Sequence, residues 1–417
     1  MVKKVQKISL QWPYKDEAEP GELTLIDNVQ FIYELALAEL ELESLGATFE
    51  LTDNLRQFKL IKSGDEEKLI KRLAYFKSVN GKLTDYFQII QKNLTRSVNQ
   101  YLTHWIYPYK GKFHPQMIRA LLNIIGLSEG DTVLDPFIGS GTLAVEAQLL
   151  GINCIGIDIS PLCVLQSRVK TESLYAISEI LEFKRRITEN AKPSLFSDKR
   201  LSLDQVIESI PDERIRNFYK LVQLVAISDQ ERRGREFARA FFKNLELMIS
   251  SVKNYDQIVQ ELSLNLGKVE IKKGDARKLD LEDESVDGII TSPPYSIALD
   301  YVDNDAHALK ALEHNIKDIR EDFIGVRGKG QERLWFYNED MKYCLAEMYR
   351  VLKPSKFAVI IIGNAHYLGK EVNTVEFIID YASKIGFKLF RNIDKIIYGL
   401  YNVMQKENIL IFQKVTI

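Results

Sequence analysis

Hydrophobic and polar positions follow two different patterns along the chain, and the change falls near Tyr101. Residues 1–100 have a mainly helical pattern, with the acidic segment FIYELALAELELESLG followed by the basic segment EEKLIKRLAYFKSVNGKL. From Asp131 onward, short apolar runs alternate with longer segments of helical spacing. The pattern therefore predicts a helical N-terminal region and a second region in which strands and helices alternate.

Seven apolar runs of the second region are predicted to be strands. They are Thr132–Leu134, Ile152–Ile157, Val269–Ile271, Val286–Thr291, Phe357–Ile362, Gly386–Phe390 and Asn408–Phe412. Strands that alternate with helices predict a parallel sheet with right-handed crossovers. We therefore expect an α/β protein with a Rossmann-like fold, in which helices cover both faces of a mostly parallel seven-stranded sheet.

The chain between the second and third predicted strands is too long for an ordinary crossover. It is mostly helical and charged, and it predicts a helical insertion at about residues 174–265. The expected organisation is an N-terminal, mainly helical region at 1–100, which is a candidate for DNA contact, and a domain at 101–417 that carries the insertion.

The distribution of charge is uneven although the net charge is only −2. Residues 1–50 hold 4 Lys and Arg against 10 Asp and Glu, whereas residues 51–120 hold 13 against 5. A basic region of this kind can contact phosphates, or it can be a solvated helical face.

The cysteine and histidine content excludes several classes of protein. Cys154, Cys163 and Cys344 form no CxxC pair, which fits a reducing cytoplasm. The five histidines show no metal-ligand spacing, so no metal is expected. No apolar run reaches the length of a membrane span, and the N-terminus has no pattern of a signal peptide. We expect a cytoplasmic protein without a membrane partner.

A candidate ligand site follows the first predicted strand, in the turn 135–142, which reads DPFIGSGT. Ligands of open parallel sheets bind beyond the carboxyl ends of the strands, and the helix after the turn offers free N–H groups. Asp158 ends the second strand, where an acid can hold both ribose hydroxyls, and Asp275 follows the third. Asp135 would repel a pyrophosphate but suits a cation with an amino group. The pattern favours a nucleoside cofactor such as S-adenosylmethionine; the alternative is a plain turn.

A second candidate site, TSPPY, ends the fourth strand. Pro293 and Pro294 fix two φ angles and remove two N–H donors, so the carbonyls there are held in fixed directions. Such carbonyls and the Ser292 hydroxyl can accept both hydrogens of an exocyclic base amine, and Tyr295 can stack on the base. A base from a duplex would first have to be flipped out. The alternative is a rigid turn with a buried tyrosine.

The pairing of DPFIGSGT with TSPPY resembles the S-adenosylmethionine-dependent amino methyltransferases of DNA, which make N4-methylcytosine or N6-methyladenine. KGKFHP resembles the segment over the methionine end of the cofactor, and GDAR the segment near its adenine. The resemblance covers residues 101–417 apart from the insertion. It implies a catalytic tetrapeptide at Ser292, Pro293, Pro294 and Tyr295. It also implies that these residues contact the cofactor: Phe113, Pro115, Asp135, Pro136, Phe137, Gly139, Ser140, Gly141, Thr142, Asp158, Ile159, Asp275 and Ala276.

The resemblance further implies a site-specific enzyme that modifies double-stranded DNA, as the modification half of a restriction or defence system with a cognate endonuclease. Serine at position 292 favours cytosine N4 over adenine N6. Methylation at cytosine C5 is disfavoured, because it needs a cysteine nucleophile and no cysteine ends a strand beside the turn. Two alternatives stay open: an RNA methyltransferase acting on guanine N2, and a specificity or scaffold subunit without turnover.

The residues that read the DNA are predicted less directly, since neither residues 1–100 nor the insertion matches a known recognition domain. Candidate phosphate contacts are Lys110, Lys112, Arg327, Lys329 and Arg333. The last three lie in the segment 296–334, which we expect to be a loop with flanking glycines that orders on DNA, or else an exposed turn.

Overall fold

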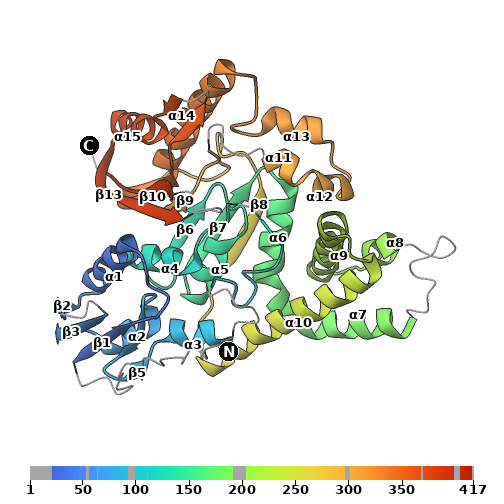
Figure 1. Cartoon of the computed structure of the whole chain (residues 1–417), viewed down its shortest axis with the longest axis horizontal. Coiled ribbons are helices and arrows are strands. Elements are labelled where there is room, and N and C mark those ends of the chain that lie inside the picture. Colours follow the sequence, from blue (N-terminus) through green and yellow to red (C-terminus); the bar gives the residue numbers. More distant parts are fainter. Residues whose placement is uncertain are drawn as a thin grey trace, which may run out of the picture.

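The computed structural model describes residues 21–52, 56–62, 64–92, 99–109, 111–190, 203–295, 301–367, 370–398 and 404–415. Two sheets dominate the described residues, and they lie in different parts of the molecule (Figure 1). The larger sheet has seven strands and carries the strand ends at which both candidate sites were predicted. The smaller sheet has five strands and belongs to the N-terminal region.

The large sheet has the order β13-β14-β10-β9-β6-β7-β8. Its strands are β6 (Thr132–Asp135), β7 (Asn153–Asp158), β8 (Val269–Lys273), β9 (Val286–Thr291), β10 (Leu352–Ile362), β13 (Phe387–Tyr398) and β14 (Met404–Lys414). Neighbours from β10 to β8 are parallel, and β14 pairs antiparallel with both β10 and β13. The seven predicted strands and the mostly parallel sheet are confirmed.

Successive residues of the strands face opposite sides of this sheet, as strand geometry requires. Val133 and Ile290 pack on one face with α4 (Pro115–Ile124) and α5 (Thr142–Leu149). Their neighbours Leu134 and Ile289 pack on the other face. That face is covered by two helices, α14 (Gln331–Val351) and α15 (Thr374–Lys384). The expected helical layers on both faces are therefore present.

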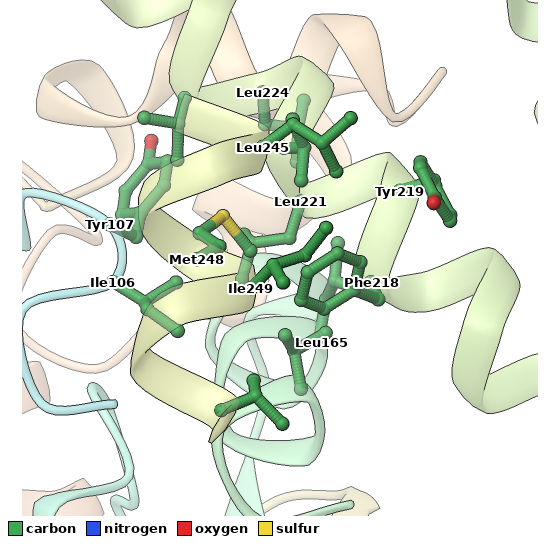
Figure 2. Packing of buried hydrophobic residues seen from close by; sticks show 14 of the residues in the cluster. Ile106, Tyr107, Leu165, Phe218, Tyr219, Leu221, Leu224, Leu245, Met248 and Ile249 are labelled. Atoms are coloured by element: carbon green, nitrogen blue, oxygen red, sulfur yellow. The ribbon is translucent and has the colours of Figure 1, made fainter. Parts of the chain in front are cut away.

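The segment between β7 and β8 is helical in its described part. It consists of α6 (Pro161–Glu172), η1 (Ser173–Ala176), α7 (Ile177–Asn190), α8 (Leu203–Glu208), α9 (Glu213–Arg233) and α10 (Phe237–Glu261). Figure 2 shows Phe218 and Leu221 of α9 and Met248 of α10 packed near Leu165 of α6 and Ile106. The helices of the insertion thus share one continuous core with the domain that they interrupt.

In its described part, the N-terminal region mixes strands with helices, so the prediction of a mainly helical region was wrong. It contains β1 (Glu22–Leu25), α1 (Ile32–Ser44), β2 (Thr48–Leu51), β3 (Gln57–Lys62), α2 (Glu66–Arg72), β4 (Phe76–Val79), β5 (Lys82–Leu83) and α3 (Asp85–Gln91). The segment EEKLIKRLAYFKSVNGKL starts as α2 but continues as the β4–β5 hairpin. Asn80 and Gly81 form its two-residue turn with φ of 50° and 78°, the positive values that an Asn-Gly hairpin turn adopts.

Buried polar side chains attach the N-terminal region to α4. The carboxylate of Glu41 in α1 accepts hydrogen bonds from the Ala74 N–H (2.9 Å) and from the Asn123 amide (2.6 Å). Arg119 of α4, also fully buried, donates to the Lys71 carbonyl (3.0 Å). Because every one of these groups would be costly to bury without a partner, the two regions are fixed against each other.

The chain after TSPPY was predicted to be a loop, and this prediction was also wrong. Its described part contains α11 (Tyr301–Asn304), α12 (Ala306–Ala311) and α13 (Ile316–Asp322). A short antiparallel ribbon, β11 (Ala365–Tyr367) with β12 (Lys370–Val372), follows β10. Among the described residues, no helix combines the length and apolar character that a bilayer span requires.

Candidate active site

The strand order reverses between β6 and β9, which lie side by side although β7 and β8 come between them in the sequence. Such a switch point is where open α/β sheets bind ligands, beyond the carboxyl ends of the strands. β6 ends at Asp135 and β9 ends at Thr291, so both candidate motifs start at this point.

A cavity of about 730 Å³, part of it open to solvent, lies at these strand ends. Most of the predicted site residues line it: Phe113, Pro136, Phe137, Gly139, Ser140, Asp158, Ile159, Asp275, Ala276, Ser292 and Pro294. Residues of the turn 135–142 and of TSPPY therefore border one space at the carboxyl ends of the strands. The other predicted site residues belong to the same segments but do not line the cavity: Pro115, which is the first residue of α4, Asp135, Gly141, Thr142, Pro293 and Tyr295.

The turn after β6 is held in shape from the side of α6. Lys170 donates to the Ser140 carbonyl (2.6 Å), and Gln166 donates to the Gly139 carbonyl (3.1 Å). Gly141 has a φ of 75°, and a Cβ there would lie 2.7 Å from Ser167 Oγ. The turn thus needs glycine both for its conformation and for its close approach to α6. No sequence motif marks the α6 residues Gln166, Ser167 and Lys170, because their contact with the turn depends on tertiary packing.

Asp135 is fully buried between the two motifs. Its Oδ1 accepts hydrogen bonds from the Thr291 hydroxyl (2.6 Å) and the Phe137 N–H (3.0 Å). Its Oδ2 is buried and has no hydrogen-bond partner. Burial raises the pKa of Asp135 to about 7, although these two hydrogen bonds lower it in part. A buried acceptor without a donor fits a ligand that brings its own N–H groups.

Asp158 ends β7 and lines the cavity. Its two oxygens accept hydrogen bonds from the Ser160 and Gly139 N–H groups, both at 2.9 Å. Burial raises the pKa of this carboxyl to about 6, against the lowering effect of those hydrogen bonds. Each carboxylate oxygen can accept a second hydrogen bond, so Asp158 can still receive ribose hydroxyls.

An arginine network borders the cavity on its other side. Arg277 contacts Asp275 (2.7 Å), Asp340 (3.1 Å) and the Asp322 carbonyl (3.0 Å). Arg327 contacts the same Asp340 at 2.5 Å. This network fixes the segment 322–324, whose residues line the cavity together with Tyr109, Gly111, Ile138 and Gly274. None of these residues was a predicted contact, although Gly111, Ile138 and Gly274 lie within the motifs KGKFHP, DPFIGSGT and GDAR. Tyr109 directly precedes KGKFHP, whereas the segment 322–324 had no sequence signal.

The predicted phosphate contacts lie in unlike surroundings. Lys112 donates to the His104 carbonyl, and burial lowers its pKa to about 8. Arg327 pairs with Asp340, and Arg333 donates to the Gly325 carbonyl (2.5 Å). These three side chains therefore have partners within the protein, and their contact with phosphates stays a prediction. Lys329 is exposed, and Lys110 lies outside the described residues.

Tyr295 follows the two prolines and is half-buried. Its hydroxyl donates to Glu407 of β14 at 2.5 Å. The three cysteines are buried and unpaired, and none lines the cavity. In the described part of the chain, no group of three or more His, Cys, Asp or Glu side chains is placed to hold a metal ion.

Comparison with known proteins agrees with this geometry. A family model described as "DNA methylase" matches residues 14–167. Type II methyltransferase M.BsoBI of Geobacillus stearothermophilus is 26% identical over 314 residues, which cover 61% of this chain and 60% of that enzyme. Type II methyltransferase M.MjaII of Methanocaldococcus jannaschii is 24% identical over 392 residues, which cover 64% of this chain and 73% of that enzyme.

A shorter match is to the tRNA (guanine(10)-N2)-dimethyltransferase of Methanothermobacter thermautotrophicus, 34% identical over 77 residues, with 18% of this chain and 22% of that enzyme covered. The chain spans 60% of the length of the Geobacillus relative.

The strand order and the paired strand-end motifs define a Rossmann-like sheet with a ligand site at its switch point. More narrowly, residues 14–167 are similar to a DNA methylase family, and longer stretches of the chain are similar to type II methyltransferases. This similarity implies S-adenosylmethionine as cofactor, and Asp158 in the cavity lining can accept its ribose hydroxyls.

Proposed function

We propose that this protein is a site-specific DNA methyltransferase that methylates the exocyclic amine of a flipped base, with cytosine N4 as the preferred target. The observation that carries the proposal is that Ser292 and Pro294 line the same cavity as Gly139 and Asp158. We call Ser292–Tyr295 the catalytic corner and 135–142 the cofactor turn. Because the two segments border the same space, they can bring an amine and a methyl donor together.

The cofactor would be held at three places along the strand ends. Asp135 Oδ2 would accept from its ammonium group, and Asp158 from its ribose hydroxyls. Asp275 and Ala276 would border the adenine, with Phe323 on the opposite segment. When bound, the cofactor supplies a methyl group activated by a sulfonium. The carboxylates and the turn only bind and orient it.

The target amine would be held by the corner after β9. The Ser292 hydroxyl and backbone carbonyls would accept its hydrogens, which turns the nitrogen lone pair toward the methyl carbon. The prolines keep those carbonyls in fixed directions, and Tyr295 offers its ring as a stacking face. The amine gains the methyl as the carbon–sulfur bond breaks, and it then loses a proton.

Three alternatives differ in substrate or in turnover. Adenine N6 has the same amine chemistry, and Ser292 is the feature that favours cytosine. Guanine N2 in RNA is suggested by the short match to a tRNA guanine methyltransferase, which covers 18% of this chain. A scaffold subunit is disfavoured, because a subunit that catalyses no reaction does not need Ser292, Pro294 and Asp158 to line one cavity.

The test is transfer of a tritiated methyl group to unmethylated DNA and to RNA in competition, followed by nucleoside analysis. We expect label in N4-methyldeoxycytidine and loss of transfer in Ser292→Ala. Label in N6-methyladenine would show that the target is adenine N6 and not cytosine N4. Label in RNA guanine would show that the substrate is RNA. Equal transfer by Ser292→Ala and wild type would contradict the role given to the corner.

Specific DNA reading and a cognate endonuclease belong to the same proposal. Lys329 is the predicted phosphate contact that is exposed. Lys329 lies between α13, which ends at Asp322, and α14, which begins at Gln331. Substituting Lys329 should reduce binding equally on all DNA sequences, as expected for a phosphate contact.

A further inference from the structure

The last hairpin of the sheet contacts the catalytic corner through a glutamate. The Tyr295 hydroxyl donates to Glu407 Oε1 at 2.5 Å. The other oxygen of Glu407, Oε2, pairs with Lys395 Nζ at 2.5 Å. Lys395 and Glu407 are direct partners in the pairing of β13 with β14. The carboxylate therefore bridges the tyrosine to a lysine on the outermost strand.

Both members of the ion pair are shielded from solvent. The side chain of Glu407 is 16% exposed and that of Lys395 is 11% exposed. Shielding strengthens the attraction between the charges and the hydrogen bond to the phenol, and an ionised acceptor makes that bond stronger than a neutral one would. A surface pair would hold the carboxylate loosely, whereas this one fixes its direction.

Gly363 explains how Tyr295 can reach β14, which is not the neighbour of β9. β10 lies between β9 and β14, and its last residue, Ile362, pairs with Asn408. Gly363 therefore lies opposite Glu407. A Cβ on Gly363 would lie 2.9 Å from the Lys406 carbonyl and 3.6 Å from Glu407 Cγ. The absence of a side chain at this point leaves the approach to Glu407 unobstructed.

We propose that Glu407, held by Lys395, is a positioning residue that fixes the ring of Tyr295 for stacking on the target base. The C-terminal hairpin β13–β14 is then part of the base-binding site, although it lies at the end of the sheet. The proposal rests on the proposed function, because the contact between Glu407 and Tyr295 matters for catalysis only if the corner binds a base. Glu407 itself does not line the cavity, so its role would be to position Tyr295.

A double-mutant cycle tests the role in catalysis. Tyr295→Phe keeps the ring and removes the hydroxyl, and Glu407→Ala removes its acceptor. We expect each to lower kcat about tenfold, the double variant to be no worse than either, and affinity for S-adenosylhomocysteine to stay at the wild-type value. Glu407→Gln, which keeps an acceptor oxygen, should recover most of the rate. Multiplicative losses, or wild-type kcat in Glu407→Ala, would overturn the proposal.

A matched control comes from the same hairpin. Lys406 pairs with Asp394 at 3.0 Å, and both side chains are more than half exposed. Lys406→Ala removes an ion pair of β13 and β14 that does not contact Tyr295, so it should leave kcat unchanged. A loss in Lys406→Ala equal to that in Glu407→Ala would mean that the hairpin acts only through its stability.

A second readout separates this inference from the proposed function. In the full chain labelled with 3-fluorotyrosine, the ¹⁹F signal of Tyr295 is assigned by its absence in Tyr295→Phe. We expect Glu407→Ala, but not Lys406→Ala, to shift or broaden this signal. If wild-type protein methylates no nucleic acid, the proposed function fails. An unmoved signal overturns the positioning contact whatever the activity.

Discussion

The hydroxyl of Thr291 donates a hydrogen bond of 2.6 Å to the carboxylate of Asp135, and both side chains are fully buried. The contact joins the last residue of β9 to the last residue of β6, which are 156 positions apart in the sequence. The residue that leads into the proposed catalytic corner, Ser292–Tyr295, is thus bonded to the acid that begins the proposed cofactor turn, 135–142. Binding of a cofactor ammonium to Asp135 would therefore act on both motifs.

Thr291→Val removes this hydrogen bond with little change in shape. Loss of a hydrogen-bond donor to a buried charge costs about 1–3 kcal/mol, so the ionised form of Asp135 becomes less favourable. We expect affinity for S-adenosylhomocysteine at neutral pH to fall about tenfold, and Thr291→Ser, which keeps the hydroxyl, to bind as wild type does. Titration calorimetry measures both, and equal affinities for the valine and serine variants would refute the coupling.

The raised pKa of Asp135, about 7 against an ordinary 3.8, predicts pH-dependent binding. The free protein holds a proton on Asp135 below this value, and an ammonium ligand requires the ionised form. Affinity for S-adenosylhomocysteine should therefore rise from about pH 6 to about pH 8, with release of a proton. Asp158, whose pKa is raised to about 6, also changes its protonation near the acidic end of this pH range.

Calorimetry in two buffers with different ionisation enthalpies detects that proton. Asp135→Asn should show weaker binding that no longer depends on pH in the upper part of this range. Flat affinity with no buffer dependence would contradict the assigned ammonium contact.

The stability of the folded protein should change with pH in the opposite direction to ligand affinity. The unfolded chain loses the proton near the ordinary value, so Asp135 lowers the free energy of unfolding as pH rises toward about 7.

Two glycines with similar backbone conformations allow the cost of backbone strain to be measured apart from the cost of a steric clash. Gly141 and Gly234 have φ of 75° and 62°, but a Cβ would lie 2.7 Å from Ser167 Oγ at Gly141 and within 4 Å of nothing at Gly234. Gly234→Ala should cost about 1–2 kcal/mol from the left-handed conformation alone. Gly141→Ala should cost more in urea unfolding and should also abolish cofactor binding. Equal losses at the two positions would mean that α6 does not hold the turn.

The core in Figure 2 predicts that the insertion unfolds together with the domain. Met248→Ala truncates a fully buried side chain of α10 and should cost about 2–5 kcal/mol in one cooperative transition. Ile61→Ala, at a side chain that is 56% exposed, is the control and should change stability little. Two separate transitions in urea, with only one of them moved by Met248→Ala, would show an independent insertion.

The strands of the large sheet were predictable because each is a local apolar run between turn residues. Asp135, Asp158 and Ser292 could be placed at one edge for the same reason, since parallel strands end together. The β4–β5 hairpin was missed although Asn80-Gly81 is a hairpin signal, because the preceding helical pattern was extended through it.

Contacts between distant segments could not be predicted in this way. Glu407 and Lys395 carry no motif, and their relation to Tyr295 follows from the order of β9, β10 and β14. Arg327 and Arg333 resemble free basic residues in sequence, but Asp340 and the Gly325 carbonyl engage them in the folded chain. The contacts of these four residues depend on partners that the tertiary fold brings to them, so a local sequence pattern could not predict them.

If the two strand ends form one site that methylates a base amine in DNA, the methylated base must be present in the DNA of cells that make this protein. Nucleoside mass spectrometry can detect it in DNA from cells that lack other methyltransferases and express the full chain or Ser292→Ala. We expect N4-methyldeoxycytidine with the wild-type chain and none with the variant. Absence of both N4-methyldeoxycytidine and N6-methyldeoxyadenosine, in cells whose purified protein binds S-adenosylhomocysteine, would contradict the proposed function.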